Sequence, residues 1–260
     1  MVVTCNDKAW YWTLPLAWLG LGAALGQVSP LGLLLGGLFL LWLACSPRIP
    51  VWLWRGVCLL FSLALGAHLL PGFTPLPLSE PLAYSPDANP VLLRLSWDKV
   101  LVGLGLLVVW VQQPHRPSGD WPAVASVSLL TLLLVLLLAL ALNLVGWQPK
   151  WPDKFGLWLA LNLGGAVLAE ELLFRAFLQN WLVQRMGAWV GIGLTALLFG
   201  TVHWPFSPLF AGVAVLAGLG YGLVFHLSGR LWPALALHLA VNVCHVLLLT
   251  YPLRLAKPVV

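Results

Sequence analysis

The chain has 260 residues, of which 61% are hydrophobic and 8% are charged, and its mean hydropathy is +0.94. These values exclude an ordinary soluble domain, in which about 25% of the residues are charged, and predict a protein that crosses the membrane several times. The net charge of +5 comes from Lys and Arg at the ends of apolar stretches, so it does not indicate nucleic-acid binding.

Nine apolar stretches, separated by Pro, Gly and charged residues, come close to the roughly 20 residues that a membrane-spanning helix needs. We therefore predict an all-α fold, a polytopic transmembrane helical bundle of eight or nine spans. The predicted spans are residues 9–26, 29–46, 50–70, 98–113, 123–146, 156–183, 187–204, 207–227 and 231–250.

Polar residues divide the chain into two predicted regions. Residues 1–150 hold N-terminal transmembrane helices and a Pro-rich loop near 71–97 that we expect outside the membrane. Residues 151–260 carry ionisable and amide side chains within apolar helices. Such groups are costly in a bilayer, so we expect the functional core in this second region.

The first polar group is Glu170, Glu171 and Arg175, in the apolar stretch GAVLAEELLFR. In an α-helix Glu171 and Arg175 share a face four residues apart, which favours an ion pair, whereas Glu170 points about a quarter turn away. Glu170 is therefore predicted to have no local counter-ion and to be a candidate general base for water activation. The alternative is a buried ion pair that only fixes helix packing.

Two further pairs occur at the same four-residue spacing, Phe199 with His203 and His238 with Asn242. An imidazole and a carboxamide on one helix face can together stabilise the oxyanion of a tetrahedral intermediate. The alternatives are an interfacial histidine for His203, which ends a predicted span, and an interhelical hydrogen-bond pair for His238 and Asn242.

The order EExxxR, FxxxH and HxxxN on successive apolar segments resembles the CPBP family of intramembrane glutamic endopeptidases. That family includes the CAAX-processing prenyl-protein proteases and bacteriocin-processing or self-immunity proteins. The resemblance covers residues 155–250, through the segments GAVLAEELLFR, FGTVH and HLAVN.

The resemblance implies an intramembrane endopeptidase without a cofactor. Glu170 would be the general base that takes a proton from water, and His203 would help to orient that water. His238 and Asn242 would form the oxyanion hole. Supporting roles would fall to Glu171, Arg175 and Phe199. The implied partners are the lipid bilayer and a membrane-associated protein or peptide substrate, and we expect a multi-pass protein of a bacterial inner (plasma) membrane.

Two other functions remain open at the level of sequence. A zinc-dependent intramembrane protease could use Glu170, His203 and His238 as metal ligands, although the helical zinc motif HExxH does not occur in the chain. A non-enzymatic membrane binding or self-immunity protein could use the same polar groups to line a cavity or to hold helices together.

Overall fold

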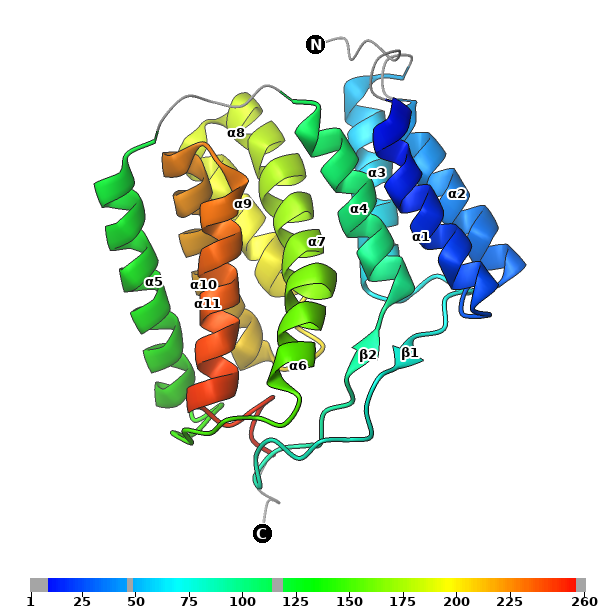
Figure 1. Ribbon diagram of the computed structural model, residues 1–260. Helices are drawn as coiled ribbons and strands as arrows, with labels where there is room; N and C mark the ends of the chain where they lie inside the picture. The colour runs from blue at the N-terminus through cyan, green and yellow to red at the C-terminus, as the bar shows by residue number, and fades with distance from the viewer. Residues whose placement is uncertain (1–8, 46–48, 114–118, 256–260) are drawn as a thin grey trace. The chain divides into compact units, whose positions relative to one another are not determined.

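The computed structural model describes residues 9–45, 49–113 and 119–255, and this part of the chain is mostly helical, as predicted (Figure 1). Ser46, the last residue of the second predicted span, lies outside the described residues. The chain divides into two compact units. The first comprises Met1–Pro77, Arg94–Pro114 and Gly164–Leu173, and the second comprises Leu78–Leu93, His115–Leu163 and Phe174–Val260.

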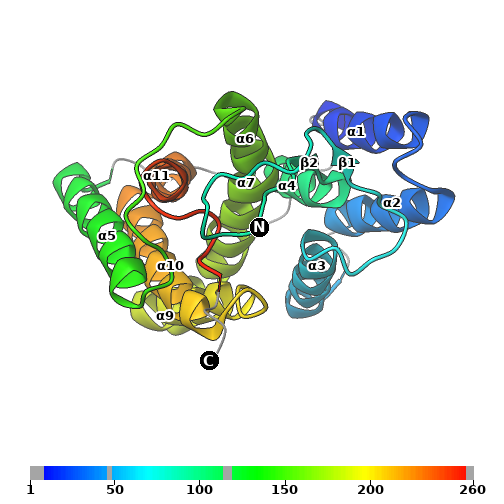
Figure 2. The same cartoon turned by 90° about the horizontal axis from the view of Figure 1, so that it is seen from below.

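The first unit is organised around helix α4. Its elements are the 3-10 helix η1 (Ala9–Trp12), α1 (Thr13–Ala24), α2 (Pro30–Ala44), α3 (Val51–Gly66), α4 (Trp97–Val111) and α7 (Leu168–Glu171). Helices α1, α2, α3 and α7 all pack against α4, and Figure 2 shows α1, α2 and α3 grouped beside it. Gly103 of α4 faces Ala169 of α7, so the acidic pair that follows Ala169 lies on the helix that contacts α4.

Local sequence explains where α2 begins and how the loop that follows α3 meets it. Ser29 accepts a hydrogen bond from the backbone N–H of Gly32 at 3.3 Å, and Pro30 occupies the first turn, where its missing N–H costs nothing. Gly32 also lies against Gly72, where an added Cβ would come within 2.2 Å of the Gly72 carbonyl oxygen. Further along this loop, β1 (Leu76–Pro77) pairs antiparallel with β2 (Arg94–Leu95).

The second unit is organised around helix α10. Its helices are α5 (Trp121–Ala141), α6 (Phe155–Leu161), α8 (Asn180–Met186), α9 (Ala188–Thr201), α10 (Pro208–Ser228) and α11 (Leu231–Leu248). Helix α10 packs against α5, α9 and α11, and these four lie together in Figure 2. Helices α5 and α10 begin in the same way, with Asp120 and Ser207 accepting backbone hydrogen bonds beside an early proline.

One long helix, Phe155–Met186, carries the acidic motif and is irregular around it. The π-helical segments η3 (Asn162–Val167) and η4 (Leu172–Gln179) flank the short α-helical segment α7. In a π-helix each N–H bonds to the carbonyl five residues earlier rather than four, and such insertions occur frequently at functional sites. The register of side chains in this helix therefore departs from the regular 100° per residue.

Part of the Pro-rich loop belongs to the packed interior of the second unit. Tyr84 and Leu93, from the loop, form an apolar cluster with Trp158 of α6 and Val246 of α11. Tyr84 also donates a hydrogen bond to the carbonyl of Asp153 at 2.9 Å. This part of the Pro-rich loop is thus fixed to α6 and α11.

Four helices are long and apolar enough to cross a membrane: Trp121–Ala141, Phe155–Met186, Pro208–Ser228 and Leu231–Leu248. Shorter apolar helices are Pro30–Ala44, Val51–Gly66 and Ala188–Thr201. On α5, leucines such as Leu129 and Leu137 are about 60% exposed, a surface suited to lipid rather than water. The chain is therefore a multi-pass membrane protein, while the count of eight or nine spans stays a prediction.

Candidate active site

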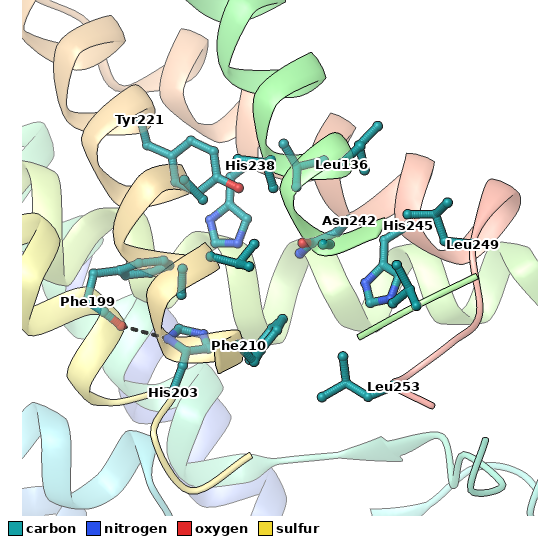
Figure 3. Close-up of a pocket in the computed structure, with 17 residues that line it drawn as sticks. Leu136, Phe199, His203, Phe210, Tyr221, His238, Asn242, His245, Leu249 and Leu253 are labelled. Atoms are coloured by element: carbon teal, nitrogen blue, oxygen red, sulfur yellow. Dashed lines mark hydrogen bonds between the residues drawn. The ribbon is translucent and has the colours of Figure 1, made fainter. Parts of the chain in front are cut away.

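His203 lies just after the C-terminal end of α9, and its orientation is fixed by its own helix. Its Nδ1 is 2.7 Å from the carbonyl oxygen of Phe199, shown as the dashed line in Figure 3. A carbonyl only accepts, so Nδ1 carries the hydrogen and donates it. In the neutral imidazole, Nε2 then keeps its lone pair, which can accept a hydrogen bond from water.

His238 and Asn242 lie one turn apart on α11 and line the same pocket as His203. The His238 ring is 5% exposed and stacks on Tyr221 of α10, with centroids 4.6 Å apart and planes at 18°. Asn242 donates through Nδ2 to Oδ1 of Asn162 at 3.1 Å. The amide nitrogen has two hydrogens, so one remains for a second acceptor.

The ring of Phe199 connects the two histidines to the rest of the unit. Its centroid lies 4.7 Å from that of His203 and 5.8 Å from that of His238, the second contact being edge-on. It also meets Phe174 and Tyr221 at steep angles. Phe199 therefore packs against both imidazoles, and its supporting role in the site stays a prediction.

Arg175 is fully buried and is held by aromatic faces and a backbone carbonyl. Its guanidinium carbon lies 4.5 Å from the centroid of the Phe199 ring and 5.2 Å from that of Tyr221. Its Nη2 donates to the carbonyl of Gly218 at 3.2 Å. Arg175 thus joins η4 to α9 and α10, while its predicted ion pair with Glu171, which is also fully buried, stays a prediction.

Phe199, His203, His238 and Asn242 line one pocket of the second unit (Figure 3). Its water-accessible volume is about 80 Å³, well above the roughly 10–15 Å³ that one water molecule needs. Tyr221, His203, His238, Asn242 and His245 give it a polar side. The remaining lining is aliphatic or aromatic and includes Val135, Leu136, Ala139, Val145, Phe210, Leu249 and Leu253. The pocket can hold water beside apolar groups.

Glu170 belongs to the first unit, where the structure corrects one prediction. Lys99 of α4 donates from Nζ to Oε1 of Glu170 at 2.8 Å, and the two side chains are 24% and 17% exposed. Glu170 was predicted to have no local counter-ion, because only its own helix could be considered. The prediction was wrong, since the cation is supplied by a helix 71 residues away in sequence.

Three residues at these sites were not found from sequence: Lys99, Asn162 and Tyr221. Lys99 starts a predicted span and reads as an interfacial residue. Tyr221 lies in a Gly-rich apolar helix and reads as core. Asn162 precedes Glu170 by about two turns, and an amide within an apolar helix was the available signal that it has a polar partner.

Among the residues that the structure describes, no group of three His, Cys, Asp or Glu side chains is placed to hold a metal ion. The predicted alternative set was Glu170, His203 and His238. His203 and His238 line the pocket of the second unit, and Glu170 belongs to the first unit. Removing metal ions with a chelator is the experiment that tests this alternative.

Comparison with known proteins identifies the segment that carries the motifs. The family model described as Rce1-like, type II CAAX prenyl endopeptidase, matches residues 152–244. Residues 152–244 form a domain of this family. The Rce1-like domain is that of a protease, and it contains all three sequence motifs, which confirms the resemblance seen in the sequence. The chain matches no curated protein and no solved structure.

Proposed function

We propose that the protein is an intramembrane endopeptidase that hydrolyses peptide bonds of membrane-associated proteins or peptides. The observation that supports this most is the convergence of His203, His238 and Asn242 on one pocket that can hold water, within the Rce1-like domain. Three helices apolar enough to span a bilayer, α5, α10 and α11, contribute to the lining of this pocket, so a substrate would reach it from the membrane.

In the proposed reaction, Glu170 takes a proton from a water molecule whose oxygen attacks the carbonyl carbon of the peptide bond. His203 would orient that water through the lone pair of Nε2, because Nδ1–H is committed to the Phe199 carbonyl. These roles for Glu170 and His203 are carried over from the matching motifs and require the carboxylate to be ionised before attack.

His238 and Asn242 would stabilise the negative oxygen that forms on attack. An N–H of the His238 imidazole and the second hydrogen of Asn242 Nδ2 are the proposed donors, and preorganised donors of this kind typically contribute 10²- to 10³-fold in kcat. When the tetrahedral intermediate collapses, the C–N bond breaks and the proton held by Glu170 passes to the departing amine. Water is thereby divided between the two products, and the protein returns to its starting state.

The proposed placement in the cell follows the same resemblance. Residues 1–150 would hold the catalytic core, residues 151–260, in the inner (plasma) membrane of a bacterium. The lipid bilayer and a membrane-associated substrate would be its partners.

The experiment that tests the proposal replaces Glu170 by Gln, which keeps the shape of the side chain and removes its ability to take a proton. Membrane peptides from cells with the native chain and with Glu170→Gln are compared by quantitative mass spectrometry. We expect cleavage products that disappear in the variant while the protein stays folded in the membrane.

The matched control is Glu80→Gln, the same chemical change at an exposed glutamate of the Pro-rich loop. It should leave all products in place. Identical peptide sets for the native chain and Glu170→Gln would contradict the protease proposal and favour a non-enzymatic binding role.

A further inference from the structure

The carboxylate of Asp87 ties together three segments that are far apart in the sequence. Its Oδ1 accepts a hydrogen bond from Gln148 Nε2 at 3.1 Å. Its Oδ2 accepts from Thr250 Oγ1 and from Arg254 Nε, both at 3.1 Å. One side chain of the Pro-rich loop therefore holds both the α5–α6 connection and the segment that follows α11.

We call the segment that follows α11 the strap, residues 249–254. Besides Asp87, the backbone of the α5–α6 connection holds it: Thr250 N donates to the Gly146 carbonyl at 2.9 Å, and Arg254 N donates to the Leu144 carbonyl at 3.0 Å. Gly146 N in turn donates to Thr250 Oγ1 at 3.0 Å. Thr250 is fully buried, and its hydroxyl accepts a hydrogen bond from Gly146 and donates one to Asp87. These bonds hold the strap in one position.

The strap forms one end of the pocket. Leu249 and Leu253 both line it, and Figure 3 shows them beside His245 at the same end. His245 donates from Nε2 to the Thr250 carbonyl at 3.0 Å, so the ring that lines the pocket is oriented by the strap. A continuous set of hydrogen bonds thus runs from Asp87 through Thr250 to the pocket wall.

Every member of this arrangement lies outside the Rce1-like domain, residues 152–244. The polar side of the pocket comes mainly from the domain, through His203, Tyr221, His238 and Asn242. Leu249 and Leu253 add apolar lining from outside the domain, beside that of Phe210 and Val241 within it. Part of the surface that would select an apolar substrate side chain therefore lies outside the domain that carries the proposed chemistry.

We propose that Asp87 is a specificity-determining residue that acts through the strap. It holds Leu249 and Leu253 in place, and they limit the size of the apolar substrate side chain that the pocket admits. This inference rests on the proposed protease function. In a hydrophobic pocket, one methylene of misfit typically changes kcat/KM roughly 10- to 200-fold, so a small displacement of two leucines is enough to alter selection.

The first test measures selectivity rather than activity alone. The probes are membrane-anchored fluorogenic peptides that differ only in one residue beside the cleaved bond, which is Ala, Val, Leu or Phe. For Asp87→Asn, which removes the charge that pairs with Arg254 and one of the two acceptor oxygens, we expect the ratio of kcat/KM for Phe over Ala to rise by about fivefold or more. A loss of stability alone would lower all four values together.

The control for this test is Asp120→Asn. Asp120 also lies outside the helices and accepts a backbone hydrogen bond, from Ala123, but it caps α5 and does not bond to the strap. Its four kcat/KM values should keep their native ratios. An unchanged ratio in Asp87→Asn would overturn the role in specificity.

The second test needs no cleavage. A cysteine placed at Leu253 is alkylated with a maleimide in the folded protein, and the labelling of the parent chain is subtracted to remove the native thiols. We expect alkylation to be about tenfold faster when Asp87→Asn or Thr250→Val is added, because the strap opens more often. Thr250→Val keeps the shape of the side chain and serves if the Asp87 variant does not fold.

The two tests separate the failure of this inference from that of the proposed function. Equal alkylation rates with and without Asp87→Asn would contradict the claim that Asp87 holds the strap in place, whatever the protein catalyses. Suppose instead that Asp87→Asn speeds alkylation but Glu170→Gln cleaves as well as the native chain. The role of Asp87 in holding the strap would then stand, and the protease mechanism on which its role in specificity rests would be rejected.

Discussion

Lys99 Nζ lies 2.8 Å from Glu170 Oε1, which gives the proposed general base a cationic partner from another helix. The carboxylate is therefore held in one orientation and kept beside a positive charge in a partly buried place. Lys99 lies outside residues 152–244, so the Rce1-like domain alone does not supply this contact. We interpret Lys99 as a positioning residue for Glu170.

The first prediction concerns this ion pair. Lys99→Met keeps much of the apolar stem but removes the charge and the hydrogen bond, and we expect kcat to fall about tenfold or more, because a misplaced catalytic group costs up to about 10²-fold. Lys99→Arg can still donate to the carboxylate and should retain most of the rate. Both are measured by cleavage of a membrane-anchored peptide in detergent.

Lys154→Met is the control for the general effect of removing a lysine. Lys154 is exposed in the second unit, outside the membrane-spanning segments. If Lys99→Met cleaved at the native rate, the contact would be structural only, and a loss in thermal stability without a loss in kcat would show this directly.

The second prediction concerns Asn162, which accepts the hydrogen bond of Asn242 at 3.1 Å. If that bond aims the remaining N–H of Asn242 at the oxyanion, Asn162→Ala should lower kcat about tenfold and leave KM nearly unchanged. Asn242→Ala should lower kcat further. The double variant should be no slower than Asn242→Ala, since both changes remove the same function.

The result of this cycle distinguishes positioning from packing. If the losses in kcat of the two single variants added up in the double variant, Asn162 would support the helix independently of Asn242. A loss confined to KM would place the pair in substrate binding instead of in stabilisation of the oxyanion.

The sequence predicted those features that a single helix encodes. Four-residue spacing placed Phe199 with His203 and His238 with Asn242, and the structure brings all four around one pocket. Apolar length likewise predicted a helix within each of the nine stretches. These predictions succeed because both signals depend on the geometry of one segment.

Contacts between distant segments were not predictable in the same way. Lys99 and Glu170 are 71 residues apart, and Asp87 and Thr250 are 163 residues apart. The π-helical segments around Glu170 also change the side-chain register, which a calculation at 100° per residue does not include. The sequence therefore identified the polar groups but not their partners.

The third prediction concerns the pH dependence of the strap. Burial acts to raise the pKa of Asp87, but hydrogen bonds from Arg254, Gln148 and Thr250 outweigh it and hold the pKa below its usual value of 3.8. A carboxyl with a lowered pKa in the folded state stabilises that state above its unfolded pKa. The contribution is lost as the pH falls through the folded value.

We therefore expect the amide protection factors of Thr250 and Arg254, corrected for intrinsic exchange, to be constant from pH 7 to about 5 and to fall below about pH 4. In Asp87→Asn they should be lower at pH 7 and should change less with acid. An acid response of the same size in Asp87→Asn would assign the response to another group, such as His245, which bonds to the Thr250 carbonyl.

The last prediction separates the glutamic mechanism from the zinc alternative. If Glu170 takes the proton from water directly, a strong chelator such as 1,10-phenanthroline should leave kcat unchanged, since no step requires a metal. A zinc site built from Glu170, His203 and His238 would instead lose activity and regain it with added zinc. Glu170→Asp sharpens the comparison, because it keeps a carboxylate but shortens its reach. The glutamic mechanism predicts a residual rate that the chelator does not change.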